Sequence, residues 1–101
     1  MDKERYFKTE GDIIYPDKSM LTWGPFYYHS LDKAKSKMND IMNDITSWCN
    51  LQDPSLNIKP ENLVNATSET QIVFDIKAWK DDTTLQDCDG IISVDEIFFE
   101  D

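Results

Sequence analysis

The chain has 101 residues, a formal net charge of −10 and a hydrophobic content of 40%. This length suits a single domain spanning residues 1–101 with a modest core, and the hydrophobic content is too high for a disordered chain. The negative charge argues against direct binding to nucleic acid or to an anionic membrane. The sequence shows neither a membrane span of roughly 18 apolar residues nor an apolar signal stretch at its start. We therefore expect a cytoplasmic protein.

Three short strands are predicted in the first part of the chain. Residues 5–8 and 12–15 are candidates on either side of Gly11, and residues 21–23 form a third. Glycine and proline interrupt regular structure, so we expect a break at Gly11 and an end to the third strand at Gly24-Pro25.

An amphipathic helix is predicted for residues 30–49, with Ser30 as a suitable N-cap. Its outer face runs from basic to acidic, against the preference of the helix dipole, so this helix must be stabilised by packing. The apolar residues recur at intervals of three and four, which places them on one face. They are Leu31, Ala34, Met38, Ile41, Met42, Ile45, Trp48 and Cys49.

The last third of the chain predicts a long antiparallel hairpin. Residues 71–79 and 91–99 are rich in β-branched and aromatic residues, and the connection between them is polar and ends in Gly90. Before the hairpin, Pro60 suits the first turn of a short helix that reaches Val64. The predicted fold is α+β, a small antiparallel sheet of about four or five strands packed against one helix.

Eight acidic residues and no Lys or Arg lie in residues 81–101, so this segment carries −8 of the formal charge. It also contains the apolar residues of 91–99, which need a core to bury them, so it is not an ordinary disordered acidic tail. Its carboxylates are therefore expected to occupy fixed positions on the hairpin, where they attract a cationic partner.

Four aromatic residues and the only histidine gather in residues 23–29, directly before the predicted helix. Aromatic side chains at such a turn either cap the core or supply anchors for a protein interface. Both interpretations are open at the level of the sequence.

Residues 87–96 resemble the second half of an EF-hand calcium loop. Asp87, Asp89 and Glu96 match acidic loop positions, and hard oxygen ligands at this spacing can surround one cation. Leu85 stands where the pattern needs its first acidic ligand, and the preceding segment predicts a strand where the family has a helix. An acidic hairpin loop closed by Asp89-Gly90 is the competing interpretation.

The sequence contains no motif of a catalytic or cofactor-binding site. It lacks the patterns of nucleophilic hydrolases, phosphate-binding loops, zinc proteases and dinucleotide-binding turns. Cys49 and Cys88 are predicted to be free thiols, because they lie far apart and no ligand pattern surrounds them. We expect a protein without enzyme activity, catalytic residues or cofactor.

These observations favour an inhibitor of a basic protein that binds or cuts nucleic acid, with carboxylates standing where phosphates would sit. In size, charge and lack of motifs the chain resembles phage-encoded inhibitors of bacterial defence, including anti-CRISPR proteins, and immunity proteins that neutralise nuclease toxins. The predicted contact residues are Asp81, Asp82, Asp87, Asp89, Asp95 and Glu96, with Trp79 and Tyr27 as aromatic anchors.

Two other functions remain as alternatives. The first is a calcium-binding module that uses Asp87, Asp89 and Glu96. The second is a structural or assembly component whose exposed aromatic strand forms an interface within a larger particle.

Overall fold

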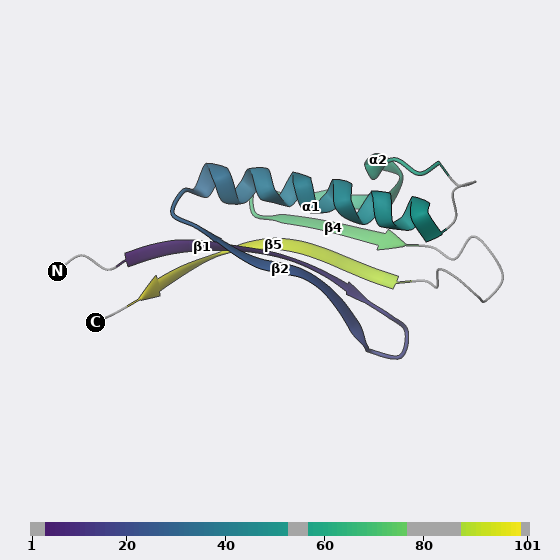
Figure 1. Ribbon diagram of the computed structural model, residues 1–101, viewed down its shortest axis with the longest axis horizontal. Coiled ribbons are helices and arrows are strands. Elements are labelled where there is room, and N and C mark those ends of the chain that lie inside the picture. The colour runs from purple at the N-terminus through teal and green to yellow at the C-terminus, as the bar shows by residue number, and fades with distance from the viewer. Residues whose placement is uncertain (1–3, 53–56, 77–87, 100–101) are drawn as a thin grey trace.

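The structure, a computed structural model, describes residues 4–52, 57–76 and 88–99. These residues form a sheet with two helices on one side of it (Figure 1). Within them, neither helix is long and apolar enough to cross a membrane. The elements in chain order are β1 (Glu4–Ile14), β2 (Met20–Tyr28), α1 (Leu31–Gln52), α2 (Pro60–Leu63), β3 (Val64–Thr67), β4 (Gln71–Ile76) and β5 (Cys88–Phe99).

The strands form one antiparallel sheet in the order β2-β1-β5-β4-β3. The two longest strands, β1 and β5, come from opposite ends of the chain and pair without interruption from Glu4 opposite Phe99 to Ile14 opposite Asp89. The predicted fold, an α+β arrangement of a small antiparallel sheet on one main helix, is confirmed.

Helix α1 begins directly after its N-cap, Ser30, whose Oγ accepts a hydrogen bond from the Lys33 N–H at 3.4 Å. It covers the predicted range and continues to Gln52. Its apolar face packs on β1, β5 and β2, and the side chains from Ala34 to Cys49 at the predicted apolar positions are buried apart from the partly buried Trp48.

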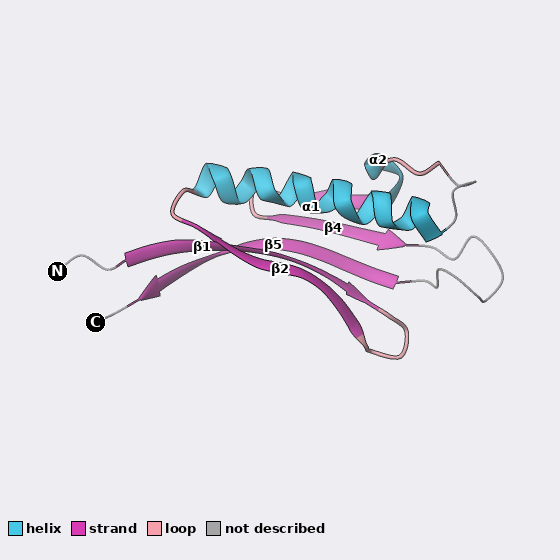
Figure 2. Ribbon diagram, in the orientation of Figure 1, coloured by secondary structure: helices cyan, strands magenta, loops and turns pink. Residues whose placement is uncertain are grey.

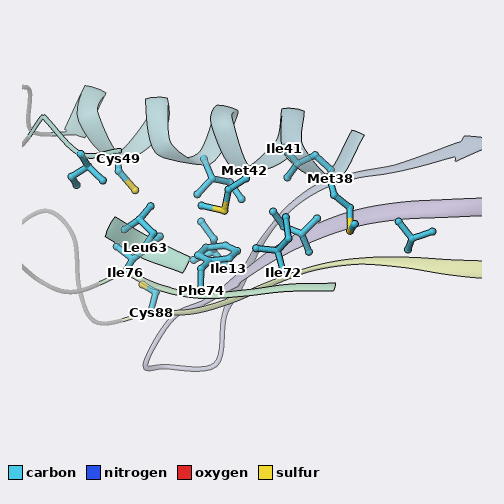
Figure 3. Close-up of a cluster of buried hydrophobic side chains, with 14 of the residues drawn as sticks. Ile13, Met38, Ile41, Met42, Cys49, Leu63, Ile72, Phe74, Ile76 and Cys88 are labelled. Atoms are coloured by element: carbon cyan, nitrogen blue, oxygen red, sulfur yellow. The ribbon is translucent and has the colours of Figure 1, made fainter. Parts of the chain in front are cut away.

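The core lies between α1 and one face of the sheet (Figure 3). Ile13 from β1 and Phe74 from β4 are completely buried, as is Ile92 from β5. They form one core cluster with the apolar residues of α1, because every second residue of a strand points to the same side of the sheet. Burial of this shared face holds the strands in their register, since a slip of one residue would expose it.

Two predicted interruptions do not occur. Strand β1 continues through Gly11, where an added Cβ would lie 2.6 Å from Ile41 Cγ2, so this glycine provides room for the helix to approach the strand. Strand β2 continues through Gly24-Pro25, which form a cis peptide bond where the register with β1 shifts. An edge strand accommodates a proline in this way because its outer N–H groups have no partner strand.

The second half of the chain differs from the prediction in its strand boundaries. Strand β3 was not expected, since its exposed residues show no apolar alternation. Strand β4 covers residues 71–76 of the predicted 71–79, and the remainder lies outside the described residues. Strand β5 begins at Cys88, earlier than the predicted residue 91, because Cys88 and Gly90 face the core.

Asn50 of α1 holds Ile58, which precedes α2, against the helix. The side-chain amide of Asn50 donates to the Ile58 carbonyl at 2.9 Å, and its oxygen accepts from the Ile58 N–H at 2.7 Å. The predicted short helix is present as α2, which starts at Pro60 and buries Leu63.

Candidate protein-binding surface

One face of the sheet is covered by α1 and α2, and the opposite face is open (Figure 2). Because successive strand residues point to opposite faces, the residues that alternate with the buried ones belong to this open face. In Figure 1, β1 and β5 bend away from α1 at both ends, so the open face lies on the inside of the bend.

The open face of the three central strands is acidic. Lys8 is the single basic residue on it within the described part of the chain. Five carboxylates occupy alternate positions of β1, β5 and β4, and we call them the carboxylate arc. They are Glu10, Asp12, Asp75, Asp89 and Asp95.

Strand register determines the spacing of the arc. Glu10 and Asp12 are two residues apart on β1, which separates their Cβ atoms by about 7 Å. Asp95 lies diagonally across from Glu10, and Asp89 lies diagonally across from Asp12, each at about 7–8 Å between Cβ atoms. Asp75 is directly opposite Asp89, at about 5 Å between Cβ atoms.

Glu10 is repelled by neighbouring carboxylates of the arc. The pKa of Glu10 is raised by partial burial, by a side-chain hydrogen bond with Asp12, and by the negative charges of Asp12 and Asp95, against the opposing effect of Lys8. Neutral donors satisfy part of the arc: the Thr22 hydroxyl donates to Asp12 Oδ1 at 2.9 Å, and the side-chain amide of Asn65 donates to Asp75 Oδ2 at 2.5 Å.

A small apolar patch lies inside the arc. Ile91 of β5 is opposite Asp12 on one side and opposite Val73 of β4 on the other. Val73 is 37% exposed, and Ile91 is partly exposed. An apolar centre with a polar rim is the usual composition of a protein interface.

The predicted contact residues do not form one surface. Asp89 and Asp95 lie on the open face, and Tyr27 of β2 is 55% exposed beside Lys8 on the same face. Glu96 points to the opposite face, where its Oε1 lies 3.2 Å from Arg5 Nη1. The other four predicted contact residues lie outside the described residues, namely Asp81, Asp82, Asp87 and Trp79.

The EF-hand interpretation requires a correction. Asp89 and Glu96 both belong to β5, a continuous strand, and not to a loop that could wrap around a cation. Seven residues of extended strand separate their Cα atoms by roughly 23 Å, and an odd separation directs the two side chains to opposite faces. These two carboxylates of one chain therefore cannot share a calcium ion. Asp87 lies outside the described residues.

Three members of the arc were not predicted as contact residues. Glu10 and Asp12 alternate with buried residues along β1, a pattern obscured by the expected break at Gly11. Asp75 was assigned to a strand, but the pairing of β4 with β5 is needed to place it opposite Asp89. In the sequence, all three could be recognised as carboxylates that alternate with core residues along a strand.

Other candidate sites in the described residues lack a set of side chains with one charge or one chemistry. A hollow of about 690 Å³ lies between α1 and the turn before β4, and its polar lining mixes both charges, including Asp32, Lys35 and Glu69. Within the described ranges no three His, Cys, Asp or Glu side chains gather as metal ligands. Burial raises the pKa of the Cys49 thiol to about 11, and the proximity of Cys88 adds to the effect, so Cys49 is not an activated nucleophile.

The segment with residues 23–29 divides its aromatic side chains between core and surface. Trp23 packs edge-on against Trp48 of α1 with ring centroids 6.1 Å apart, and Phe26 lies under the Lys37 ammonium. Tyr27 points to the open face. The core interpretation therefore holds for Trp23 and Phe26, whereas Tyr27 stays a predicted interface anchor.

No protein-family model, curated protein or solved structure matches this chain.

Proposed function

We propose that this chain is a small acidic inhibitor that binds a basic protein partner through the open face of its sheet. The partner is a protein that binds or cuts nucleic acid, and the carboxylates occupy the positions that phosphates would take. The protein acts in the cytoplasm, without a cofactor, as do the inhibitors of defence systems and nuclease toxins that it resembles.

The observation that carries this proposal is the direct opposition of Asp75 and Asp89 within the arc. Like charges directly opposite each other destabilise a sheet, so the opposition of Asp75 and Asp89 does not add to the stability of the fold. A cationic partner relieves the repulsion and gains charge-assisted hydrogen bonds, above all from arginine, which binds carboxylates and phosphates in the same bidentate geometry.

The ordered backbone beneath the arc supports mimicry of a phosphate array rather than unspecific attraction of a cationic partner. The arc stands on β1, β5 and β4, whose opposite face is the fully packed core. The backbone that carries these carboxylates is therefore ordered before the partner arrives, which lowers the entropic cost of binding. Ile91, Val73 and the exposed Tyr27 add contact area that slows dissociation, while the charges accelerate and orient encounter.

The test compares two variants with equal changes in charge. The arc variant carries Glu10→Gln, Asp12→Asn, Asp89→Asn and Asp95→Asn. The control variant carries Asp32→Asn, Asp40→Asn, Asp44→Asn and Glu61→Gln, all at exposed positions of α1 and α2. Wild-type protein is used to isolate basic proteins from a lysate of the source organism, and each purified partner is then titrated with the three forms at low and high salt.

We expect the arc variant to bind at least about tenfold more weakly, with a flatter dependence on salt, and the control variant to bind like the wild type. Duplex DNA or RNA should compete with the wild-type protein for the same partner. Equal losses in both variants, or no competition by nucleic acid, would contradict the proposal.

A further inference from the structure

We infer that the partner element that occupies the open face is a basic amphipathic α-helix. This inference rests on the proposed function and specifies the chemistry of the partner. Its basis is the position of the arc and of the apolar patch on a sheet face, away from either edge of the sheet.

A sheet face and a sheet edge bind different kinds of segment. An extended peptide needs the free N–H and C=O groups of an edge strand to satisfy its own backbone. A face offers side chains only, because the backbone groups of its central strands are already paired. A helix satisfies its backbone internally, so it can lie on a face without burying unpaired polar groups.

The two edges of this sheet are poorly suited to strand addition. Edge strand β2 contains Pro25, which has no N–H to donate, at the point where its register shifts. Edge strand β3 has only four residues. An extended basic segment would therefore meet an interrupted edge at β2 and a short one at β3.

The dimensions of the arc match those of a helix. Asp89 and Asp95 are six residues apart on β5, or roughly 20 Å, which is the length of about 13 helical residues. The arc reaches from β1 to β4, two strand spacings or about 10 Å, close to the diameter of a helix. A helix along β5 would lie over Ile91, with Glu10 and Asp12 along one side and Asp75 on the other.

Charge complementarity determines which side chains the partner helix presents to the arc. Lysine or arginine at i, i+4, i+7 and i+11 of such a helix lies on one side at intervals of about 6 Å, similar to the spacing of the arc. A second copy of this chain would bring two acidic faces together, so it does not fit. The complex would have the partner helix and α1 on opposite faces of one sheet.

The experiment uses the full chain and a synthetic probe. The probe is an alanine-based peptide of about 18 residues with lysines at i, i+4, i+7 and i+11 and leucines between them on the same face. Its control is a diastereomer with two D-residues at the centre, which has the same charge and composition but cannot form a helix. Binding is followed at about 150 mM salt through the amide resonances of the isotope-labelled protein.

We expect the helical peptide to bind at least about tenfold more tightly than the diastereomer, with the largest amide shifts in the central strands. The double variant Asp12→Asn/Asp89→Asn should lose about tenfold in affinity. The double variant Asp40→Asn/Asp44→Asn, with the same change of charge on the exposed side of α1, should bind like the wild type.

Equal binding of both peptides, or shifts confined to β2 and β3, would overturn the inference. A basic protein that binds the wild type but not the arc variant, combined with no preference for the helical peptide, would refute the helix and leave the proposed function standing. Failure of every basic protein to bind would refute the proposed function itself.

Discussion

The hydroxyl of Thr9 in β1 donates a buried hydrogen bond of 2.9 Å to the backbone carbonyl of Ala34 in α1. Thr9 is completely buried on the covered face of the sheet, so this bond joins the helix to the strand that carries Glu10. It fixes how the first turns of α1 sit on the sheet, and it satisfies a polar group that would otherwise be buried without a partner.

Replacing this hydroxyl provides the first prediction. Thr9→Val keeps the shape of the side chain but removes the donor, so the free energy of unfolding should fall by about 1 kcal/mol. Thr9→Ser keeps the donor and should retain the helix contact. Urea denaturation measures both effects, and an unchanged stability of Thr9→Val would show that the bond contributes nothing net.

The second prediction concerns the packing around Gly90. A Cβ at this site would collide with the ring of Phe74 on the neighbouring strand β4. Gly90→Ala should therefore lower the free energy of unfolding by about 1–3 kcal/mol, the usual cost of overpacking. Ser93→Ala, on the open face of the same strand, should change it by less than about 0.5 kcal/mol.

A second substitution distinguishes this steric cause from a loss of backbone geometry. Phe74→Leu makes room beside residue 90, so the double variant should lose less stability than the sum of the two single variants. Strict additivity would argue against the predicted collision.

The raised pKa of Glu10 predicts a dependence of stability on pH. Ionising this carboxyl costs more in the folded chain than in the unfolded one, so the contribution of Glu10 to stability is greatest below its unfolded-state pKa and falls as the pH rises through the folded-state pKa. Glu10→Gln removes this loss. The variant should be more stable than the wild type at pH 7 by less than about 1 kcal/mol, because solvent screens the group.

Urea titrations at about pH 3.5 and pH 7 test this prediction, since the difference between the two proteins should shrink at the acidic pH, where Glu10 is protonated in both folded and unfolded chains. Glu69→Gln, in the turn before β4, is the control for loss of one negative charge. A larger gain for Glu69→Gln than for Glu10→Gln would contradict the proposed repulsion within the arc.

The thiols provide a fourth prediction. Cys49 and Cys88 are buried and form no disulfide, and the pKa of Cys49 is raised to about 11. At pH 8 only about one Cys49 in a thousand is ionised, and the thiolate is the reactive form. A disulfide reagent should therefore modify the folded chain slowly and the urea-unfolded chain rapidly at both cysteines.

The single variants Cys49→Ala and Cys88→Ala assign any fast reaction to one thiol. Rapid labelling of Cys49 in the folded chain would show that this part of the core opens, and the fully buried position of Cys49 would then be wrong.

The sequence by itself determined the type of each main element. The three- and four-residue spacing from Ala34 to Cys49 requires a helix with one buried face, and Pro60 marks the start of α2. Alternation in residues 71–79, and the β-branched and aromatic content of residues 91–99, predict strands. Together these periodicities predict an α+β fold, because such faces can be buried only against one another.

Only the tertiary structure decided which carboxylates act together. The pairing of β1 with β5, between opposite ends of the chain, brings Glu10 and Asp12 beside Asp89 and Asp95. The same register turns Glu96 to the other face, since neighbouring strand residues point in opposite directions. Charge along a sequence carries no information on strand neighbours; these follow from burying Ile13, Phe74 and Ile92 together under α1.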